Sequence, residues 1–281
     1  YNAVDGVRLF RPMDNFARAT RSAERLAMPA LDEDLAMEGL KLLLKVEKDW
    51  IPTAPGTSLY IRPTMVATDV FLGVHASDSY LFFIILSPVG AYYAAGLQPV
   101  KIYVEDEYVR AARGGIGFTK AAANYAASIY AGELAEKKGY SQVLWLDAVE
   151  RKYIEEVGAM NMFFVIDGAI VTPPLRGSIL PGITRDSVIK LGRKMGYDVQ
   201  ERLISIDEVM ETARNGHMSE AFGSGTAAVI SPVGAFCLEK EEVQVGDGGI
   251  GPISQKLYDT LTGIQYGRIP DEMGWSVKLD F

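Results

Sequence analysis

The feature that most constrains the fold is an alternation of short apolar runs with helix-like segments between residues 101 and 266. The apolar runs cover residues 101–104, 142–147, 162–172, 199–205 and 227–238. The segments with helical periodicity cover residues 119–138, 183–195, 206–215 and 252–266. Strands that alternate with helices in this way are typical of α/β or α+β proteins, in which helices cover a sheet. The pair Asp167-Gly168 also predicts a tight hairpin turn within the run 162–172.

The N-terminal third has a different order of expected strands and helices, which predicts a smaller α+β domain. A strand is expected at 7–10, helices at 14–26 and 32–48, and further strands at 58–62 and 80–86. The helix at 32–48 is expected to bury its apolar side, which carries Leu35, Leu42, Leu43 and Val46.

The run 80–86 is apolar throughout, which predicts a strand buried on both faces. It is far shorter than the roughly 20 residues that a membrane-spanning helix needs. Residues 92–99, which are rich in small residues, are the candidate linker. We therefore expect a small domain at 1–91, a linker at 92–99 and a large domain at 100–281.

The charge and the composition exclude several classes of function. A net charge of −8 argues against nucleic-acid binding, which needs a basic face. Cys237 is the single cysteine, and His75 and His217 are the only histidines, so neither a disulfide nor a Cys/His metal site is expected. These counts suit a reducing compartment, and we expect a cytoplasmic protein without a membrane segment.

Lys120 is the residue most indicative of chemistry. It follows the glycine-rich stretch Arg113-Gly-Gly-Ile-Gly-Phe-Thr119 and opens the alanine-rich helix at 119–138. A cation in the first turn of a helix faces the positive end of the helix dipole, which favours a readily deprotonated amine. Asn124, four residues later, lies on the same face of that helix, and Tyr125 lies on the next edge. The alternative is a solvated lysine without a role.

Three further segments could bind polar ligands. Glu155-Glu-Val-Gly-Ala-Met-Asn161 brings carboxylates to the start of an apolar strand. Ile179-Leu-Pro-Gly-Ile-Thr-Arg185 opens a helix at which the backbone N–H groups of Ile183 and Thr184 could bind an anion. Ala221-Phe-Gly-Ser-Gly-Thr-Ala227 is a glycine-rich turn that could hold a phosphate or a carboxylate. Taken singly, each also reads as an ordinary polar loop.

Together and in this order, the motifs resemble the branched-chain amino acid aminotransferases, which are pyridoxal-phosphate (PLP) enzymes of fold type IV. Other segments that carry the resemblance are Arg8-Leu-Phe-Arg-Pro, Gly56-Thr-Ser-Leu-Tyr-Ile-Arg-Pro63, Ser87-Pro-Val-Gly-Ala-Tyr92, Gln142-Val-Leu-Trp-Leu146 and Ile264-Gln-Tyr-Gly267. The resemblance implies a small N-terminal α+β domain and a larger domain with a mixed, barrel-like sheet surrounded by helices. It also implies a homodimer that transfers amino groups from L-leucine, L-isoleucine and L-valine to 2-oxoglutarate, giving L-glutamate.

The resemblance assigns roles at the cofactor. Lys120 matches the lysine that binds PLP covalently and moves the substrate proton, and Tyr125 matches the tyrosine beside the phenolic oxygen of PLP. Glu156 matches the carboxylate that pairs with the pyridine nitrogen. The residues that match the phosphate site are Arg18, Ile183, Thr184 and Thr226.

It also assigns roles at the substrate. Tyr60, Arg62 and Tyr92 match residues around the side-chain pocket, with Arg62 the expected partner for the second carboxylate of glutamate. Thr226 and Ala227 match the turn that binds the α-carboxylate. One departure is Ala159, which stands where close relatives often have threonine.

Alternatives remain within the fold type. A D-amino acid aminotransferase or a 4-amino-4-deoxychorismate lyase would share Lys120 and Glu156, and would differ in the substrate pocket. The segment from Gly56 to Pro63 favours the branched-chain reading. A non-catalytic, ligand-binding member of the fold is disfavoured by the presence of both Lys120 and Glu156.

Overall fold

The computed structural model describes residues 1–90 and 97–281, which form two compact units. Unit 1 comprises Tyr1–Ala94 with Thr262–Phe281, and unit 2 comprises Ala95–Leu261. The sequence had grouped residues 262–281 with the larger domain. In the structure they group with unit 1, because strand β14 (Ser276–Lys278) pairs antiparallel with β2 (Gly6–Phe10). Tyr92 and residues 92–96 of the expected linker lie outside the described residues.

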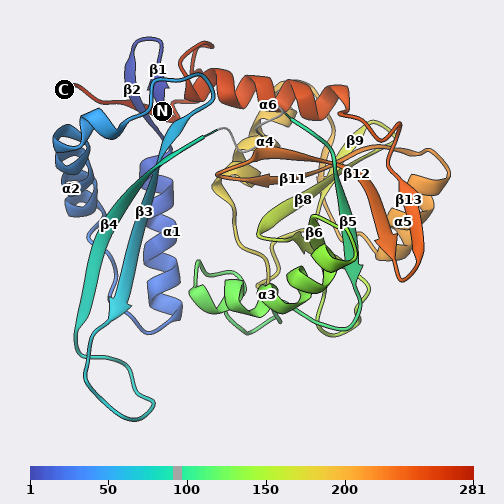
Figure 1. The fold of residues 1–281 in the computed structure, drawn as a ribbon, viewed down its shortest axis with the longest axis horizontal. Helices are drawn as coiled ribbons and strands as arrows, with labels where there is room; N and C mark the ends of the chain where they lie inside the picture. The colour runs from blue at the N-terminus through green and yellow to red at the C-terminus, as the bar shows by residue number, and fades with distance from the viewer. Residues whose placement is uncertain (91–96) are drawn as a thin grey trace. The chain divides into compact units, whose positions relative to one another are not determined.

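Unit 1 contains a three-stranded sheet, a long hairpin and two main helices (Figure 1). The sheet joins β2 and β14 with β1 (Asn2–Ala3), and the hairpin pairs β3 (Ser58–Ala67) with β4 (Tyr80–Val89). The helices are α1 (Pro12–Arg25) and α2 (Glu33–Val46), and a short 3₁₀ helix, η1 (Lys48–Trp50), follows them. The core of the unit consists of Leu9, Phe16, Ala36, Met37, Leu40, Leu44, Ile51, Leu59 and Leu279.

The prediction that the run 80–86 forms a strand buried on both faces was wrong about burial. Among the described residues, β4 pairs with β3 alone, in a two-stranded sheet. Leu81 and Ile85 are 53% and 52% exposed, whereas Phe82 and Ile84 pack against the core of unit 1. One face of the strand is therefore covered, as in an ordinary half-buried hairpin.

The prediction for α2 was right about the helix and wrong about its buried side. Asp32 caps the helix, because its side chain accepts a hydrogen bond from the backbone N–H of Leu35 (3.0 Å). Leu35, Leu42 and Val46 are nevertheless exposed, at 65%, 66% and 78%. The side that packs carries Ala36, Met37, Leu40 and Leu44.

Unit 2 is built on a closed sheet, which confirms the barrel-like core that the resemblance implied (Figure 1). Six strands follow one another around the ring and pair back to the first: β8 (Met160–Ile166), β11 (Met218–Gly225), β12 (Val229–Leu238), β5 (Val100–Glu105), β6 (Gln142–Leu146) and β7 (Ile154–Val157). Three more strands extend the sheet beyond the ring: β9 (Ala169–Thr172), β10 (Val199–Glu201) and β13 (Glu241–Gln244). Parallel pairs (β12–β5, β5–β6 and β10–β9) occur beside antiparallel ones, so the sheet is mixed.

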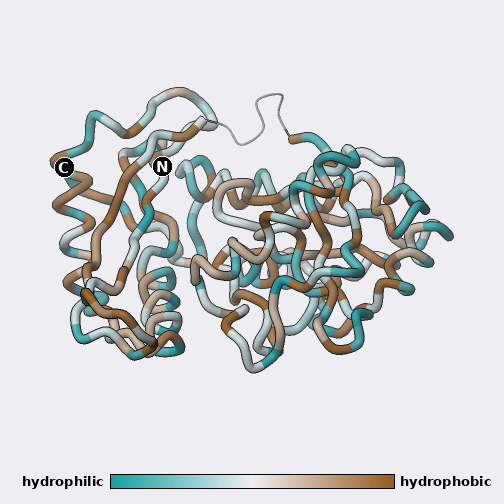
Figure 2. Tube along the Cα trace, turned by 60° about the horizontal axis from the view of Figure 1, so that its bottom comes forward, coloured by the Kyte–Doolittle hydropathy of each residue, from teal (hydrophilic) through white to brown (hydrophobic). Residues whose placement is uncertain are grey.

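Four helices surround this sheet: α3 (Ala122–Lys137), α4 (Ile183–Lys194), α5 (Ile206–Arg214) and α6 (Pro252–Gln265). The turn between β8 and β9 is the predicted one, with positive φ at Asp167 (50°) and Gly168 (81°). Hydrophobic and hydrophilic stretches alternate along the chain in both units (Figure 2). None of the helices in the described part of the chain is long and apolar enough to cross a membrane.

A buried carboxylate from β11 caps the start of α6. Glu220 is 4% exposed and accepts hydrogen bonds from the backbone N–H groups of Ile253 (2.8 Å) and Ser254 (2.7 Å). Gly251 leaves room for it, since a Cβ at that position would lie 1.9 Å from the Glu220 carboxyl carbon. Glu220 thus holds the N-terminus of α6 against the barrel.

Replacing Glu220 with alanine is expected to destabilise the protein by about 3 kcal/mol, because two buried N–H groups lose a charged acceptor. The measurement is chemical denaturation of the variant beside Glu136→Ala, which removes an exposed carboxylate on α3. Equal stability of the two variants would contradict the capping role.

Candidate active site

Lys120 lies just before α3 and not in its first turn, as the sequence had suggested. The helix begins at Ala122, because Ala121 is still extended (φ −100°, ψ 143°). The Lys120 side chain is exposed, and its Nζ donates a hydrogen bond to the hydroxyl of Tyr125. The amine and the phenol are therefore paired at the start of the helix.

The backbone before Lys120 is fixed by Asn124. The Nδ2 of Asn124 donates to the carbonyl oxygens of Ile116 and Thr119, both at 2.9 Å. Gly117 in the same loop touches a neighbouring segment so closely that a Cβ would lie 2.3 Å from the Ser178 carbonyl oxygen. This accounts for the glycine in the stretch before the lysine, and it leaves the Lys120 backbone little freedom.

Glu156 lies on β7, and its side chain is 4% exposed. Its Oε2 forms an ion pair with the Nη2 of Arg110, and its Oε1 accepts a hydrogen bond from the Nδ2 of Asn161 (3.1 Å). Burial raises the pKa of Glu156 to about 7, against the opposing charge of Arg110. This carboxyl group is therefore held in one orientation and titrates close to neutral pH.

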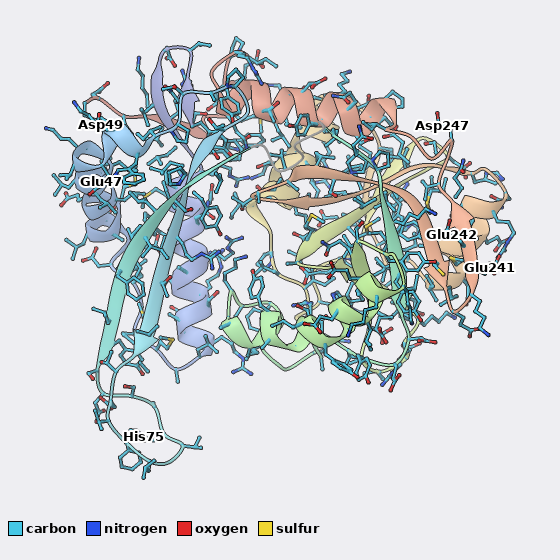
Figure 3. The ribbon with its side chains drawn as sticks, viewed as in Figure 1. Glu47, Asp49, His75, Glu241, Glu242 and Asp247 are labelled. Atoms are coloured by element: carbon cyan, nitrogen blue, oxygen red, sulfur yellow. The ribbon has the colours of Figure 1, made fainter. Side chains whose placement is uncertain are left out.

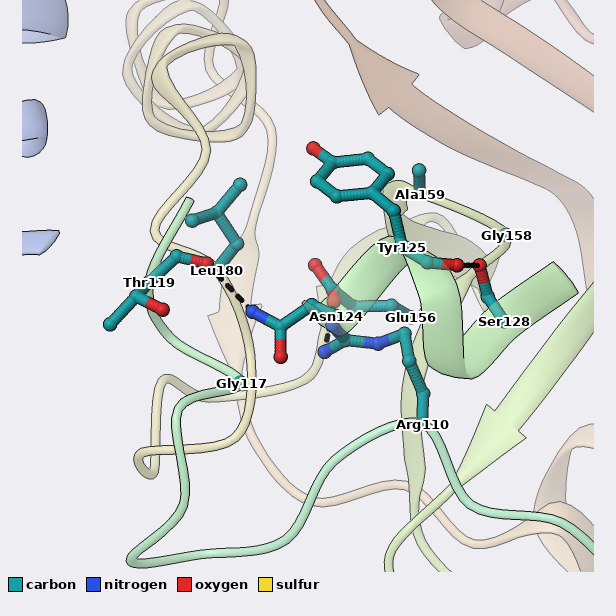
Figure 4. Close-up of a pocket in the computed structure, with 10 residues that line it drawn as sticks. All are labelled: Arg110, Gly117, Thr119, Asn124, Tyr125, Ser128, Glu156, Gly158, Ala159 and Leu180. Atoms are coloured by element: carbon teal, nitrogen blue, oxygen red, sulfur yellow. Dashed lines mark hydrogen bonds and ion pairs between the residues drawn. The ribbon is translucent and has the colours of Figure 1, made fainter. Parts of the chain in front are cut away.

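These groups line a pocket in unit 2 (Figure 4). Arg110 and Glu156 lie side by side in it, and Tyr125 projects from α3. The lining residues are Arg110, Gly117, Thr119, Asn124, Tyr125, Ser128, Glu156, Gly158, Ala159 and Leu180. The pocket thus combines a buried ion pair with the phenol that contacts Lys120.

No role was predicted for three polar residues of this region, Arg110, Asn161 and Ser224. Arg110 follows β5 in a loop without a motif, and its Nη2 also donates to the Ser178 carbonyl oxygen (2.8 Å). Ser224 is 2% exposed, and its hydroxyl has no hydrogen-bond partner among the described residues. Asn161 and Ser224 could have been proposed from their position alone, because both lie inside motifs that carry the family resemblance.

Asn161 connects the carboxylate to the start of α4. Its Nδ2 donates to the Leu180 carbonyl oxygen (2.9 Å) as well as to Glu156. Gly182 is the N-cap of α4, and a Cβ there would lie 2.1 Å from the Asn161 Oδ1. The N-terminus with Ile183 and Thr184 is thereby held close to the Glu156 strand.

Thr226 and Ala227 are exposed in the turn between β11 and β12. Ser224, two residues before Thr226, pairs in register with Asn161. The structure of unit 2 therefore connects five of the elements proposed from the sequence: Lys120, Tyr125, Glu156, the α4 start and this turn.

The other predicted residues belong to unit 1. Arg18 lies on α1, and its Nη2 donates to the Oδ1 of Asn15 (3.0 Å). Tyr60 and Arg62 share one face of β3, where the Arg62 guanidinium lies 5.2 Å from the centre of the Tyr60 ring. They line a groove of unit 1 together with Ile85, Leu86, Ser87 and Val89.

The raised pKa of Glu156 gives a testable pH dependence for the cofactor-free protein. Its folded-state pKa of about 7 lies above the usual 4.5, so the folded chain binds more protons than the unfolded chain between these values. The free energy of unfolding should therefore fall by up to about 3 kcal/mol as the pH rises through this window. Urea titrations at a series of pH values should show the fall, and Glu156→Gln should reduce it. A fall that is undiminished in that variant would contradict the assignment.

Comparisons with known proteins agree on one family. A sequence model of amino-transferase class IV matches residues 3–236. Branched-chain-amino-acid aminotransferase 2 of Bacillus subtilis (strain 168) is 57% identical over 275 residues, which is 98% of this chain and 76% of that protein.

Two solved structures extend the comparison. The Escherichia coli branched-chain amino acid aminotransferase superposes with a TM-score of 0.83 at 30% identity, covering 100% of this chain and 87% of that chain. The Thermobaculum terrenum branched-chain amino acid aminotransferase, solved in its PLP form, gives a TM-score of 0.79 at 25% identity. That match covers 100% of this chain and 87% of the other.

Proposed function

Because this chain belongs to the branched-chain amino acid aminotransferases of class IV, we propose that it transfers amino groups from L-leucine, L-isoleucine and L-valine to 2-oxoglutarate. The products are the branched-chain 2-oxo acids and L-glutamate. The reaction alternates between the two substrates, since each amino group is held on the enzyme between them.

The enzyme depends on PLP, as its family does. When bound, PLP supplies a ring that accepts electron density from the substrate carbon as that carbon loses a proton. The pocket of unit 2 fits such a group. The pocket is lined by the buried carboxyl of Glu156 and by Tyr125, whose hydroxyl contacts the amine of Lys120. Ser224, in register with Asn161, adds a buried hydroxyl without a partner among the described residues.

Lys120 is the proposed catalytic residue. Its amine would attach the cofactor and then carry the proton between the substrate Cα and the cofactor. Tyr125 contacts the amine through its hydroxyl, and would orient it and hydrogen-bond the cofactor's phenolic oxygen. Asn124 fixes the loop that precedes the lysine, so the amine starts from a defined position.

Glu156 would hold the pyridine nitrogen in its protonated form. An acid that is buried and ion-paired keeps its orientation, and its negative charge favours a positive charge on the ring nitrogen. Arg110 balances that charge, and Asn161 restrains the other carboxyl oxygen. These two residues position Glu156 and need not touch the cofactor.

The phosphate of the cofactor would be bound both by backbone N–H groups and by polar or charged side chains. Ile183 and Thr184 are the first residues of α4, where backbone N–H groups and the helix dipole favour an anion. Thr226 could add its hydroxyl from the turn after β11, and Arg18 its guanidinium.

The substrate would be bound at both of its ends. We propose that the turn at Thr226 and Ala227 binds the α-carboxylate. Tyr60 and Arg62 would contact the side chain, with the aromatic ring suited to aliphatic groups and the guanidinium to the second carboxylate of glutamate. We also propose Tyr92 as a residue of the side-chain pocket, as the resemblance implies.

The observation that carries this proposal is the Lys120–Tyr125 contact at the pocket that holds the buried Arg110–Glu156 pair. The test is an absorbance spectrum of the purified, PLP-loaded protein. A visible band should fall when L-leucine is added and return when 2-oxoglutarate follows. A band that ignores L-leucine and responds to D-alanine would assign the chain to D-amino acid transamination instead.

We also propose a homodimer. The support is two exposed apolar patches, since contiguous exposed apolar groups mark interaction sites. The loop between β3 and β4 carries Leu72 and Val74, which are 97% and 106% exposed, and His75, which lies on the same loop (Figure 3). On α3 of unit 2, Ile129 and Tyr130 are 61% and 60% exposed.

Sedimentation equilibrium tests the homodimer. Leu72→Ser and Ile129→Ser should each shift the protein toward the monomer, whereas an unsubstituted protein that sediments as a monomer would refute it.

A cytoplasmic location is proposed as well. The support is the single cysteine, Cys237, which is buried and free, as is common for thiols in reducing compartments. Fractionation of cells that express the native gene would test it.

A further inference from the structure

Glu155 is a buried acid that has no part in the proposed reaction. It precedes Glu156 on β7 and is 6% exposed. Its Oε1 contacts the hydroxyl of Ser178, and among the described residues its Oε2 has no hydrogen-bond partner. A buried carboxylate normally has its oxygens paired or hydrogen-bonded, so this environment suits a neutral carboxylic acid better than a charged one.

The local charge balance also requires a neutral acid. Glu155 and Glu156 are both buried, and Arg110 is the cation that forms an ion pair there, with Glu156. If both acids were ionised, one negative charge would remain without compensation in the interior, which burial penalises strongly. Two acids coupled in this way take up one proton between them near neutral pH.

The contacts of the two acids decide which one holds that proton. Burial raises the pKa of Glu155, and the charge of Asp147 raises it further, against the Ser178 hydrogen bond and the charge of Arg110. The oxygens of Asp147 accept backbone hydrogen bonds from Val149, Glu150, Lys152 and Tyr153. These bonds lower the pKa of Asp147, so it adds a lasting negative charge on the Glu155 side. Both oxygens of Glu156 are partnered, Oε2 by Arg110 and Oε1 by Asn161, whereas Oε2 of Glu155 has no partner among the described residues. Burial raises the pKa of both acids, but the ion pair with Arg110 favours the charge on Glu156, so the proton is left to Glu155.

We propose that the two acids share one proton and that Glu155 holds it, which makes Glu155 a positioning residue that keeps Glu156 negatively charged. A neutral Glu155 does not compete with Glu156 for the Arg110 guanidinium, and it does not repel the negative charge of Glu156. The inference rests on the proposed role of Glu156 opposite the cofactor nitrogen. A cation at that nitrogen would hold the shared proton on Glu155 more firmly still.

The test is the infrared C=O band of a protonated carboxyl group, recorded at neutral pH on cofactor-free and PLP-loaded protein. The unsubstituted protein should show the band, and so should Glu150→Gln, which changes an exposed acid before β7. Glu155→Gln and Glu156→Gln should both lose it, because Arg110 can neutralise the one acid that remains. Glu155→Gln should also keep kcat/KM for L-leucine within about threefold, since glutamine replaces a neutral acid.

Three results would overturn the proposal. Absence of the band in the unsubstituted protein would mean that Glu155 is ionised, and persistence of the band in Glu155→Gln would place the proton elsewhere. A large loss of activity in a folded Glu155→Gln variant would mean that Glu155 acts as a charge. The band is also measured on the cofactor-free protein. The position of the proton can therefore be determined even if the protein proves not to catalyse transamination.

A further variant keeps both acids and tests the proposal even if Glu155→Gln fails to fold. Ser178→Ala removes the hydroxyl that contacts Glu155, so the frequency of the band should shift. An unshifted band would show that the proton is not on Glu155.

Discussion

Replacing Lys120 with alanine is expected to lower kcat for transamination of L-leucine by at least about a thousandfold, because the variant lacks both the covalent anchor and the proton carrier. The fold should persist, since Lys120 is exposed and precedes α3. Lys120→Arg should be equally inactive although it keeps the positive charge, because a guanidinium remains protonated and cannot act as a nucleophile.

The measurement pairs kinetics with mass spectrometry. Borohydride treatment of the PLP-loaded protein should attach the cofactor permanently to Lys120, and neither variant should gain the added mass. Lys137→Ala, which changes an exposed lysine at the end of α3, is the matched control and should behave like the unsubstituted protein. Cofactor attached to another lysine, or activity in Lys120→Ala, would contradict the assignment.

The elements of the fold could largely be predicted because they follow local rules. The alternation of strands and helices after residue 100 and the Asp167-Gly168 turn are encoded by neighbouring residues, and both are confirmed. What local rules do not reveal is which neighbours a segment packs against. The run 80–86 of β4 is apolar throughout, yet among the described residues β4 pairs with β3 alone. Similarly, α2 packs its Met37–Leu40–Leu44 side while Leu35 and Leu42 face solvent.

The end of the chain illustrates the same limit over a longer range. Nothing near Ser276–Lys278 indicates that this strand pairs with Gly6–Phe10, some 270 residues earlier in the chain. The division of the chain into units therefore depends on a contact between segments that are distant in sequence.

The candidate site divides along similar lines. Lys120, Tyr125 and Glu156 could be proposed from the sequence because they lie in motifs that follow one another in a recognisable order. Arg110 was missed, since its role comes from the ring of strands that brings the loop after β5 to β7. The helix start was also placed too early, because Ala121 has high helix propensity but is held extended before α3.

Arg110 is the residue whose removal should have the second largest effect. Arg110→Met keeps a long apolar stem and removes the charge, so Glu155 and Glu156 stay buried with no ion-pair partner among the described residues. Breaking a buried ion pair from one side typically costs about 3 to 5 kcal/mol of stability. Both acids should then be protonated at neutral pH. A neutral Glu156 would no longer favour a protonated ring nitrogen, so kcat should fall by about a hundredfold or more.

The comparison that isolates this effect is a double-mutant cycle on the PLP-loaded enzyme. Arg113→Met changes an exposed arginine in the same loop and should alter neither stability nor kcat. If Arg110 acts through the charge of Glu156, adding Glu156→Gln to Arg110→Met should cost far less than either change alone, because the stranded carboxyl is gone. Strictly additive losses would mean that the two residues act independently. Arg110 would then serve the loop through its bond to Ser178, and the charge of Glu156 would have to be balanced by another group.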